Sequence, residues 1–193
     1  MGDRPKLILV PGPSGIGKTF IGKAISGRMH IPYLDLDTVC EGFLAVISGL
    51  EGGEQPYDLY ARAYRDVCYT TILGLAAENL ALGVSIVVTA PFFREMGDPD
   101  FFPRLKRENG VDFVSYDVRI LISERRLREN LVKRGSYRDA AKLQDWESFL
   151  SKIRSAERRW NADVDIPIDK GEGDIGADQL DFLVSSIRGR RSS

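Results

Sequence analysis

The chain has 193 residues, of which 43% are hydrophobic and 28% are charged; this suits one α/β domain over residues 1–193 and is too little for two ordinary domains. The formal net charge of −1 argues against a global positive field that would attract nucleic acid. Because no signal peptide opens the chain and no apolar run approaches the length of a membrane span, we expect a cytoplasmic protein with no membrane partner.

Two cysteines and one histidine are the soft metal ligands that the sequence offers. Cys40 and Cys68 lack the short spacing of a metal site, so we expect two free thiols in a reducing compartment. A single histidine, His30, cannot supply a metal cluster, and we assign it no role.

The first third of the chain predicts two strands around one helix. Leu7 to Val10 is an apolar run without alternation, which is typical of a buried parallel strand. A glycine-rich turn leads into a helix that ends near Met29. Tyr33 to Leu36 is predicted as a second strand, and residues 49–56 as a loop.

The middle of the chain predicts a long helix, a third strand and a loop. The helix runs from about Asp58 to Leu82, with Gly83 as its C-cap, and its apolar face is expected to hold Tyr60, Tyr64, Val67, Cys68, Thr71, Leu75 and Leu80. Ser85 to Thr89 is the third strand, and Pro91 to Pro103 is a loop before a helix that ends near Asn109.

The last third predicts two strands and three helices. Val114 to Leu121 is the fourth strand, after which Ser123 caps a charged helix to Arg134. The next helix is expected to carry Trp146, Phe149, Leu150, Ile153 and Trp160 as a core stripe. Val164 to Ile168 is the fifth strand, and a final amphipathic helix carries Leu180, Leu183, Val184 and Ile187. Short apolar strands that alternate with helices predict a parallel sheet covered on both faces.

A complete phosphate-binding motif, G-x-x-x-x-G-K-[ST], lies between the first predicted strand and the first predicted helix. The glycines allow a tight turn whose amides point at phosphate oxygens, and the helix adds the positive end of its dipole. The lysine brings a full charge to the β- and γ-phosphates of ATP, and the threonine hydroxyl can bind Mg²⁺. The expected nucleotide-binding residues are Gly12, Pro13, Ser14, Gly15, Ile16, Gly17, Lys18 and Thr19.

Phosphoryl transfer also needs carboxylates, and the third predicted strand ends without one. Asp35 and Asp37 follow the second predicted strand, where a period of two would place both side chains on one face. Parallel topology brings that strand end beside the phosphate loop. One carboxylate can then hold Mg²⁺, and the other can orient a hydroxyl and accept its proton.

The order of strand, phosphate loop, helix, short strand and Asp-x-Asp resembles that of the small-molecule P-loop kinases, such as shikimate and gluconate kinases. The segment Ile31 to Asp37 fits their second-strand region. The resemblance implies that Asp35 serves Mg²⁺ and that Asp37 contacts the acceptor hydroxyl.

A second resemblance covers Leu131 to Arg138, which is similar to the lid of polynucleotide kinase, where arginines meet the ATP phosphates. The chain is most similar overall to AAA-type, zeta-toxin-like and polynucleotide-kinase-like proteins. Many of these proteins have a similar stretch after the lid, which in this chain consists of Arg138-Asp139, Lys142-Leu143 and Asp145-Trp146. The resemblance implies a three-layer P-loop NTPase fold with a five-stranded parallel sheet in the order 2-3-1-4-5 and a helical lid over about residues 134–145.

A lid arginine also has a physical rationale. Phosphoryl transfer spreads negative charge over three oxygens, which a closing arginine stabilises while water is excluded. Arg134 and Arg138 are the candidates, and we favour Arg138.

The acceptor site is expected after the second and third strands. Arg94 is a candidate contact for an anionic or polyol acceptor, with Phe92 and Phe93 as walls; the alternative is a surface arginine beside two core phenylalanines. The glycine-rich run of shikimate kinases and the lysine-containing segment of gluconate kinases are both missing after the third strand.

Three functions remain open at this point. The first is an ATP-dependent kinase that phosphorylates a hydroxyl of a small molecule, such as a sugar, a nucleoside or an antibiotic-like alcohol. The second is a polynucleotide 5′-hydroxyl kinase, which would need a basic channel with stacking aromatic residues. The third is an ATP-binding regulatory module, which would need neither Asp37 nor the lid arginines. The preference for ATP over GTP and the choice between monomer and homodimer stay open.

Overall fold

A computed structural model describes residues 3–53, 60–171 and 173–189. Its sheet has five parallel strands in the order β2-β3-β1-β4-β5, which confirms the predicted order. The strands are β1 (Lys6–Pro11), β2 (Tyr33–Asp35), β3 (Ile86–Ala90), β4 (Val114–Leu121) and β5 (Val164–Asp169).

Strand β1 occupies the centre of the sheet, and its apolar sequence explains why. Leu7 and Leu9 pack into the core on one face, whereas Ile8 and Val10 pack into the core on the other. A strand buried on both faces has no polar alternation, so the continuous run in the sequence predicts this position.

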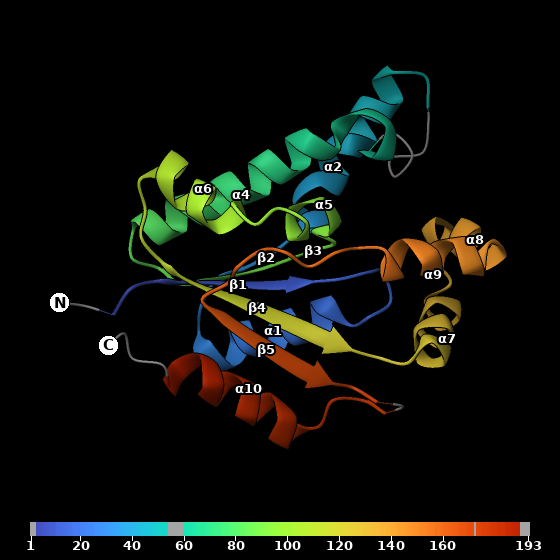
Figure 1. The fold of residues 1–193 in the computed structure, drawn as a ribbon. Helices are drawn as coiled ribbons and strands as arrows, with labels where there is room; N and C mark the ends of the chain where they lie inside the picture. Colours follow the sequence, from blue (N-terminus) through green and yellow to red (C-terminus); the bar gives the residue numbers. More distant parts are fainter. Residues whose placement is uncertain (1–2, 54–59, 172, 190–193) are drawn as a thin grey trace.

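Helices cover both faces of the sheet, as Figure 1 shows. One face carries α2 (Leu36–Leu50), α4 (Arg65–Ala81), α5 (Phe93–Met96) and α6 (Phe101–Asn109), and the other carries α1 (Lys18–Met29) and α10 (Ala177–Gly189). A π-helical turn, η1 (Tyr60–Tyr64), leads into α4. The two layers of helices bury two separate apolar clusters against the sheet.

Three further helices lie beyond the carboxyl ends of the strands (Figure 1). They are α7 (Glu124–Arg134), α8 (Tyr137–Gln144) and α9 (Trp146–Arg154). Helix α8 lies within the predicted lid region, residues 134–145, which we call the lid segment. Ligands of open parallel sheets bind at this edge, so the lid segment stands where a closing element is useful.

The second strand is shorter than predicted, and the helix after it was missed. Strand β2 ends at Asp35, and α2 begins at Leu36, because the Asp35 side chain accepts hydrogen bonds from the amides of Asp37 and Thr38 and so caps the helix. Asp37 therefore lies in the first turn of a helix, and the argument from strand periodicity was wrong. The predicted loop at 49–56 starts too early, because α2 continues to Leu50; residues 54–56 lie outside the described residues.

The long helix predicted from Asp58 has a different apolar face. Its first two residues lie outside the described residues, and Gly83 takes the positive φ of 77° expected after a helix. Val67 and Leu75 are exposed, whereas Ile72 is fully buried, so the buried stripe is rotated from the predicted one.

Two other predictions were wrong in their local structure. The loop predicted from Pro91 to Pro103 contains α5 and the start of α6. Trp160 is not on the helix of Trp146, because α9 ends at Arg154; it packs instead against Phe92 and Phe102 on the opposite side of the sheet.

The cysteines and the length of the helices bear on two further predictions. Cys40 and Cys68 are free thiols, as predicted, and both are buried. In the described part of the chain, no helix combines the length and the apolar character that crossing a membrane requires.

Candidate functional site

The loop between β1 and α1 has the backbone of a phosphate cradle. Gly12, Gly15 and Gly17 have φ values of 134°, 82° and 108°, which residues other than glycine rarely adopt. At Gly15 space is also limiting, because a Cβ there would lie 2.7 Å from the Leu131 side chain of α7. The loop therefore packs closely against the helix that precedes the lid segment.

A hydrogen bond fixes the same contact. The side-chain amide of Asn130 on α7 donates to the Gly15 carbonyl at 2.8 Å. Because this bond holds the Gly15 carbonyl toward α7, it helps to orient the amides of the loop toward a bound anion. Asn130 was not predicted as a site residue, since nothing in the sequence places it beside a residue 115 positions away.

Lys18 begins α1, and its Nζ donates to the Pro13 carbonyl at 2.9 Å. Burial lowers the pKa of Lys18 from its ordinary value of 10.5 to about 8, although the carboxylates of Asp37 and Asp35 act in the opposite direction. A buried ammonium group that is short of counter-charge is poised to gain from an anionic ligand.

We expect nucleotide affinity to fall as the pH rises above about 8. A triphosphate favours the charged lysine, so binding takes up a proton wherever Lys18 is neutral in the free protein, that is, above its pKa of about 8. The dissociation constant should be constant from pH 7 to 8 and then rise by up to about tenfold per pH unit. Calorimetry from pH 7 to 10 checks this. The variant Lys18→Arg keeps its charge and should give a flat profile; a flat profile for the unaltered protein would contradict the expectation.

Asp35 lies at the carboxyl end of β2 beside the loop. Its Oδ2 accepts hydrogen bonds from the hydroxyls of Thr89 at 2.7 Å and Tyr33 at 2.9 Å, and the Thr19 hydroxyl lies 3.4 Å from it. Burial raises the pKa of Tyr33 to about 12, so its hydroxyl stays a donor. Thr19 and Asp35 thus place hard oxygen ligands side by side, and this donor set fits Mg²⁺.

Asp37 faces the lid segment across the site. Its Oδ2 lies 3.2 Å from Arg138 Nη1, and the Asp37 side chain is 60% exposed whereas that of Arg138 is 22% exposed. The structure therefore brings together two residues that the sequence analysis selected separately. The Asp37 carboxylate remains accessible to solvent beside this contact.

The lid segment brings further cations to the loop. Arg134 Nε donates to Asp139 Oδ2 at 2.7 Å, and Lys142 Nζ lies 2.9 Å from Asp139 Oδ1 and 3.2 Å from Ser14 Oγ. Neither Lys142 nor Asp139 was predicted as a site residue. Lys142 lies four residues after Arg138 along α8, and this spacing is the signal that could have identified it.

One pocket of about 480 Å³ unites these groups. It is lined by Ser14, Gly15, Gly17, Lys18 and Thr19 of the loop, by Asp35 and Asp37, and by Arg134, Arg138 and Lys142 of the lid segment. Its size suits a nucleotide-sized ligand. Most of the predicted site residues therefore converge on a single concave surface.

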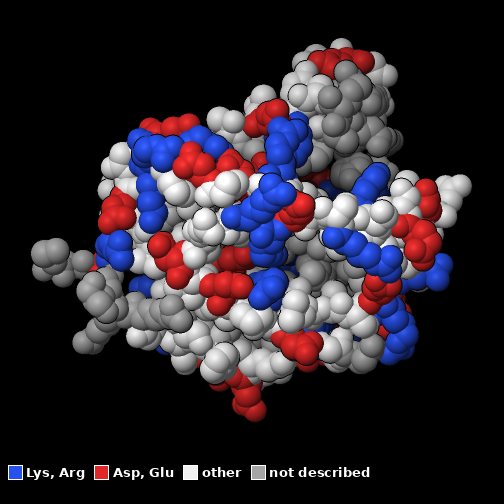
Figure 2. All heavy atoms as spheres, in the orientation of Figure 1, with Lys and Arg blue, Asp and Glu red and all other residues white. Residues whose placement is uncertain are grey.

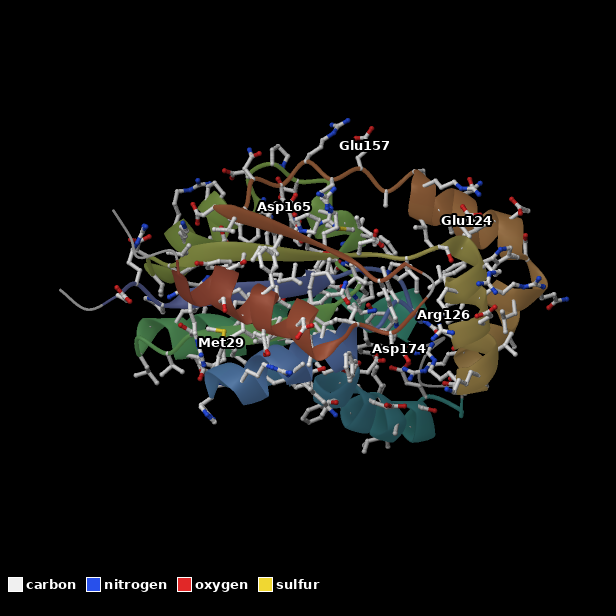
Figure 3. The ribbon with its side chains drawn as sticks, turned by 90° about the horizontal axis from the view of Figure 1, so that it is seen from below. Met29, Glu124, Arg126, Glu157, Asp165 and Asp174 are labelled. Carbon is white, nitrogen blue, oxygen red and sulfur yellow. The ribbon has the colours of Figure 1, made fainter. Side chains whose placement is uncertain are left out.

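The side of the pocket near β5 is closed by a charged contact. Lys170, which follows β5, lines the pocket beside Gly17 and lies 3.8 Å from Asp174. Asp174 also accepts a hydrogen bond from Arg126 of α7 at 3.2 Å, and Figure 3 shows these two side chains next to each other. The Arg126 side chain is partly buried in this contact.

The predicted acceptor residue Arg94 lies elsewhere. It is exposed, its Nη1 donates to Asp66 Oδ1 at 2.6 Å, and it does not line the pocket. Phe92 is fully buried and packs against Tyr69, so it belongs to the core rather than to a pocket wall. A substrate contact through Arg94 stays a prediction and would require its side chain to turn.

The chain is similar to a known domain family and to parts of longer proteins. A family model described as an AAA domain matches residues 7–156. The ATP-dependent zinc metalloprotease FtsH of Methylococcus capsulatus is 27% identical over 188 residues, which cover 92% of this chain and 28% of that protein. FtsH of a Sulfurovum species is 34% identical over 62 residues, which are 32% of this chain and 9% of that protein. The chain thus spans less than a third of the length of these curated relatives.

The protease function in that name needs its own motif. A zinc metalloprotease helix of the H-E-x-x-H type requires two histidines, and this sequence contains only His30. Among residues 3–53, 60–171 and 173–189, no group of three or more His, Cys, Asp or Glu side chains could hold a metal ion.

Solved structures share the whole fold. A candidate kinase from Chloroflexus aurantiacus matches with a TM-score of 0.70 and 18% identity, covering 98% of this chain and 97% of that chain. The tunicamycin resistance protein of Deinococcus radiodurans matches at 0.58 and 16%, covering 96% of each chain. A shikimate kinase from Bacteroides thetaiotaomicron matches at 0.54 and 16%, covering 95% of this chain and 96% of that one. At these identities the likeness shows the fold alone.

Proposed function

The chain belongs to the AAA domain family, and from that premise we propose that it is a P-loop kinase that moves the γ-phosphate of ATP onto a hydroxyl of a small molecule. The kinases and the resistance protein that share its fold support this proposal. The acceptor class, a sugar, a nucleoside or an antibiotic-like alcohol, is part of the proposal.

The observation that carries the proposal is the ion pair between Asp37 and Arg138 inside the pocket of the phosphate loop. A module that only binds ATP needs the loop and Lys18. It does not need an accessible carboxylate opposite the loop, nor an arginine that reaches it from a lid. Both groups are useful when a hydroxyl must lose a proton while charge builds on a phosphoryl group.

Nucleotide binding is assigned to the loop and to α1. The amides around Gly15 and Gly17 face the phosphates, and the positive end of the α1 dipole acts on the same anion. Lys18 adds a full charge at the β- and γ-phosphates. Thr19 and Asp35 would hold Mg²⁺, which when bound neutralises charge on the phosphate oxygens.

The transfer step uses the opposite side of the pocket. The acceptor oxygen forms a bond to the γ-phosphorus while the bond from that phosphorus to the bridging oxygen of ADP breaks. The hydroxyl proton passes to Asp37, which returns it to solvent after the product leaves. Arg138 stabilises the charge on the equatorial oxygens, and α8 excludes water.

A small pocket continues from Asp37 toward the predicted acceptor side. It is lined by Leu36, Cys40, Leu44, Tyr60 and Tyr137, together with Asp37, Glu41 and Arg138. Its volume of about 30 Å³ is close to that of one water molecule, so these apolar and aromatic walls would contact only a small part of an acceptor whose hydroxyl lies at Asp37. Lysine and arginine side chains are interspersed with acidic ones over the face drawn in Figure 2. The net charge of −1 favours a small molecule over a polynucleotide, because a protein that binds nucleic acid gains from a positive field.

The test combines nucleotide binding with transfer. Labelled ATP and Mg²⁺ are incubated with pools of sugars, nucleosides, aromatic and alicyclic alcohols and 5′-hydroxyl oligonucleotides, and transferred label is measured. We expect label on a small alcohol. Lys18→Met should weaken ATP binding by about 100-fold or more, because a charge-assisted contact to the phosphates is lost. Lys23→Met, an exposed position on the same helix, is the control and should bind ATP normally.

Two outcomes would change or overturn the proposal. Label on the oligonucleotides alone would replace the small-molecule acceptor with a nucleic acid end. Absence of ATP binding by the unaltered protein in calorimetry would overturn the kinase proposal.

A further inference from the structure

A carboxylate is buried in the lid segment between two cations. Asp139 of α8 has a side chain that is only 1% exposed, and ion pairs hold it on both sides. Its Oδ2 accepts from Arg134, which ends α7, and its Oδ1 lies 2.9 Å from Lys142, three residues further along α8. Burying a carboxylate is costly without such partners, and the hydrogen bonds from both cations hold the pKa of Asp139 below its usual value against the effect of burial.

The two cations are bound differently. Arg134 turns two donors, Nε and Nη2, onto the same Asp139 oxygen. Lys142 divides its ammonium group between Asp139 and the Ser14 hydroxyl of the phosphate loop, which lies 3.2 Å away. Arg134 is thus committed to the carboxylate, whereas Lys142 connects the carboxylate to the nucleotide site.

Lys142 also shares a face of α8 with Arg138. It lies four residues after Arg138, so the two side chains emerge on the same face of the helix. Arg138 reaches Asp37 at the acceptor side, while Lys142 reaches Ser14 in the loop, and both line the same pocket. A phosphoryl group that passes from the loop to an acceptor at Asp37 must lie between these two contacts.

We propose that Lys142 contacts the terminal phosphate of the bound nucleotide, and that Asp139 is the positioning residue that fixes Lys142 and Arg134. The proposal rests on the proposed function, since it assumes a triphosphate in the loop. The contact with Ser14 shows that the Lys142 ammonium group can reach the loop. A clamp that only stabilised the lid segment would not need the contact with Ser14.

The test compares a triphosphate with a diphosphate. The probes are the non-hydrolysable ATP analogue AMP-PNP and ADP, each with Mg²⁺, measured by calorimetry on the full chain. We expect Lys142→Met to weaken AMP-PNP binding by about 10- to 100-fold, the effect of losing one charge-assisted contact, and to change ADP binding by less than about threefold. Lys142→Arg, which keeps the charge, should recover most of the preference for AMP-PNP.

The matched control is Lys152→Met, an exposed lysine on α9, which should bind both nucleotides as the unaltered protein does. Equal weakening of AMP-PNP and ADP by Lys142→Met, or no weakening at all, would overturn the contact with the terminal phosphate. If the unaltered protein binds neither nucleotide, the proposed function itself fails, and that outcome is distinct.

Asp139 is tested through the same ratio of affinities, which a purely structural role would not move. Asp139→Asn should lower the preference for AMP-PNP. In the double variant with Lys142→Met, the loss of preference should be smaller than the sum of the two single losses, because Asp139 acts through Lys142. Full additivity would show that Asp139 does not act through Lys142. If Asp139→Asn does not fold, Asp139→Glu keeps the charge but displaces it, and is measured in the same way.

Discussion

Asp37→Asn is expected to lower kcat for phosphoryl transfer by about 100- to 10,000-fold, the range of general base catalysis, while Kd for ATP changes by less than about threefold. Asparagine keeps the shape of the side chain and can still meet Arg138, but it cannot accept the hydroxyl proton. The side chain is 60% exposed, so the substitution should not disturb folding. Single-turnover transfer of labelled phosphate and calorimetry with Mg²⁺ and ATP measure the two quantities separately.

The control for Asp37 is a carboxylate at the other end of the sheet. Asp112 precedes β4, at the amino ends of the strands, and forms an exposed ion pair with Arg4. Asp112→Asn should transfer phosphate at the unaltered rate. If Asp37→Asn instead loses ATP binding and transfers normally once saturated, Asp37 serves the nucleotide and another group takes the proton.

The sheet could be predicted from the sequence because its strands are chemically simple. Leu7 to Val10 is buried on both faces, and a parallel strand that is buried in this way carries an apolar run without alternation. The phosphate motif directly after it then fixes the edge at which the ligand binds. These two features are local, and local features are what a single sequence records.

The helix after β2 could not be predicted because Asp35 supports two interpretations. An Asp-x-Asp pattern fits a strand end with two carboxylates, but it also fits a helix N-cap. The structure has Asp35 as the cap, with its Oδ1 on the amides of Asp37 and Thr38. Both carboxylates still line the pocket, so the predicted residues converge there although the predicted backbone was wrong.

The lid shows a different limit. The resemblance selected Arg134 and Arg138, and both line the pocket. Their partners separate them. Arg134 pairs with buried Asp139, five residues away, whereas Arg138 crosses the pocket to Asp37, which is 101 positions away. Similarly, no local pattern records that Arg94 pairs with Asp66 outside the pocket. Contacts across such separations depend on the packed fold.

Arg138→Ala is expected to lower kcat by about 1,000- to 100,000-fold, as for arginines that stabilise the transition state of phosphoryl transfer, with a much smaller effect on Kd for ATP. Arg138 is the lid cation whose side chain already reaches the acceptor carboxylate, so its charge lies where the phosphoryl group is transferred. Arg138→Lys keeps a charge without the planar fork and should give an intermediate rate. Pre-steady-state transfer assays at saturating ATP measure the effect.

Substitution of Arg134 tests which of the two lid arginines, Arg134 or Arg138, stabilises the transition state. Because Asp139 holds two of its donors, Arg134 is expected to act by placing α8, so Arg134→Ala should lower kcat less than Arg138→Ala and should also reduce thermal stability. Arg125→Ala, an exposed arginine on α7, should leave the rate unchanged. The opposite order, with Arg134→Ala the more damaging and Arg138→Ala within about tenfold of the unaltered rate, would place the transition-state charge at Arg134. It would also mean that the ion pair between Arg138 and Asp37 must open before the acceptor binds.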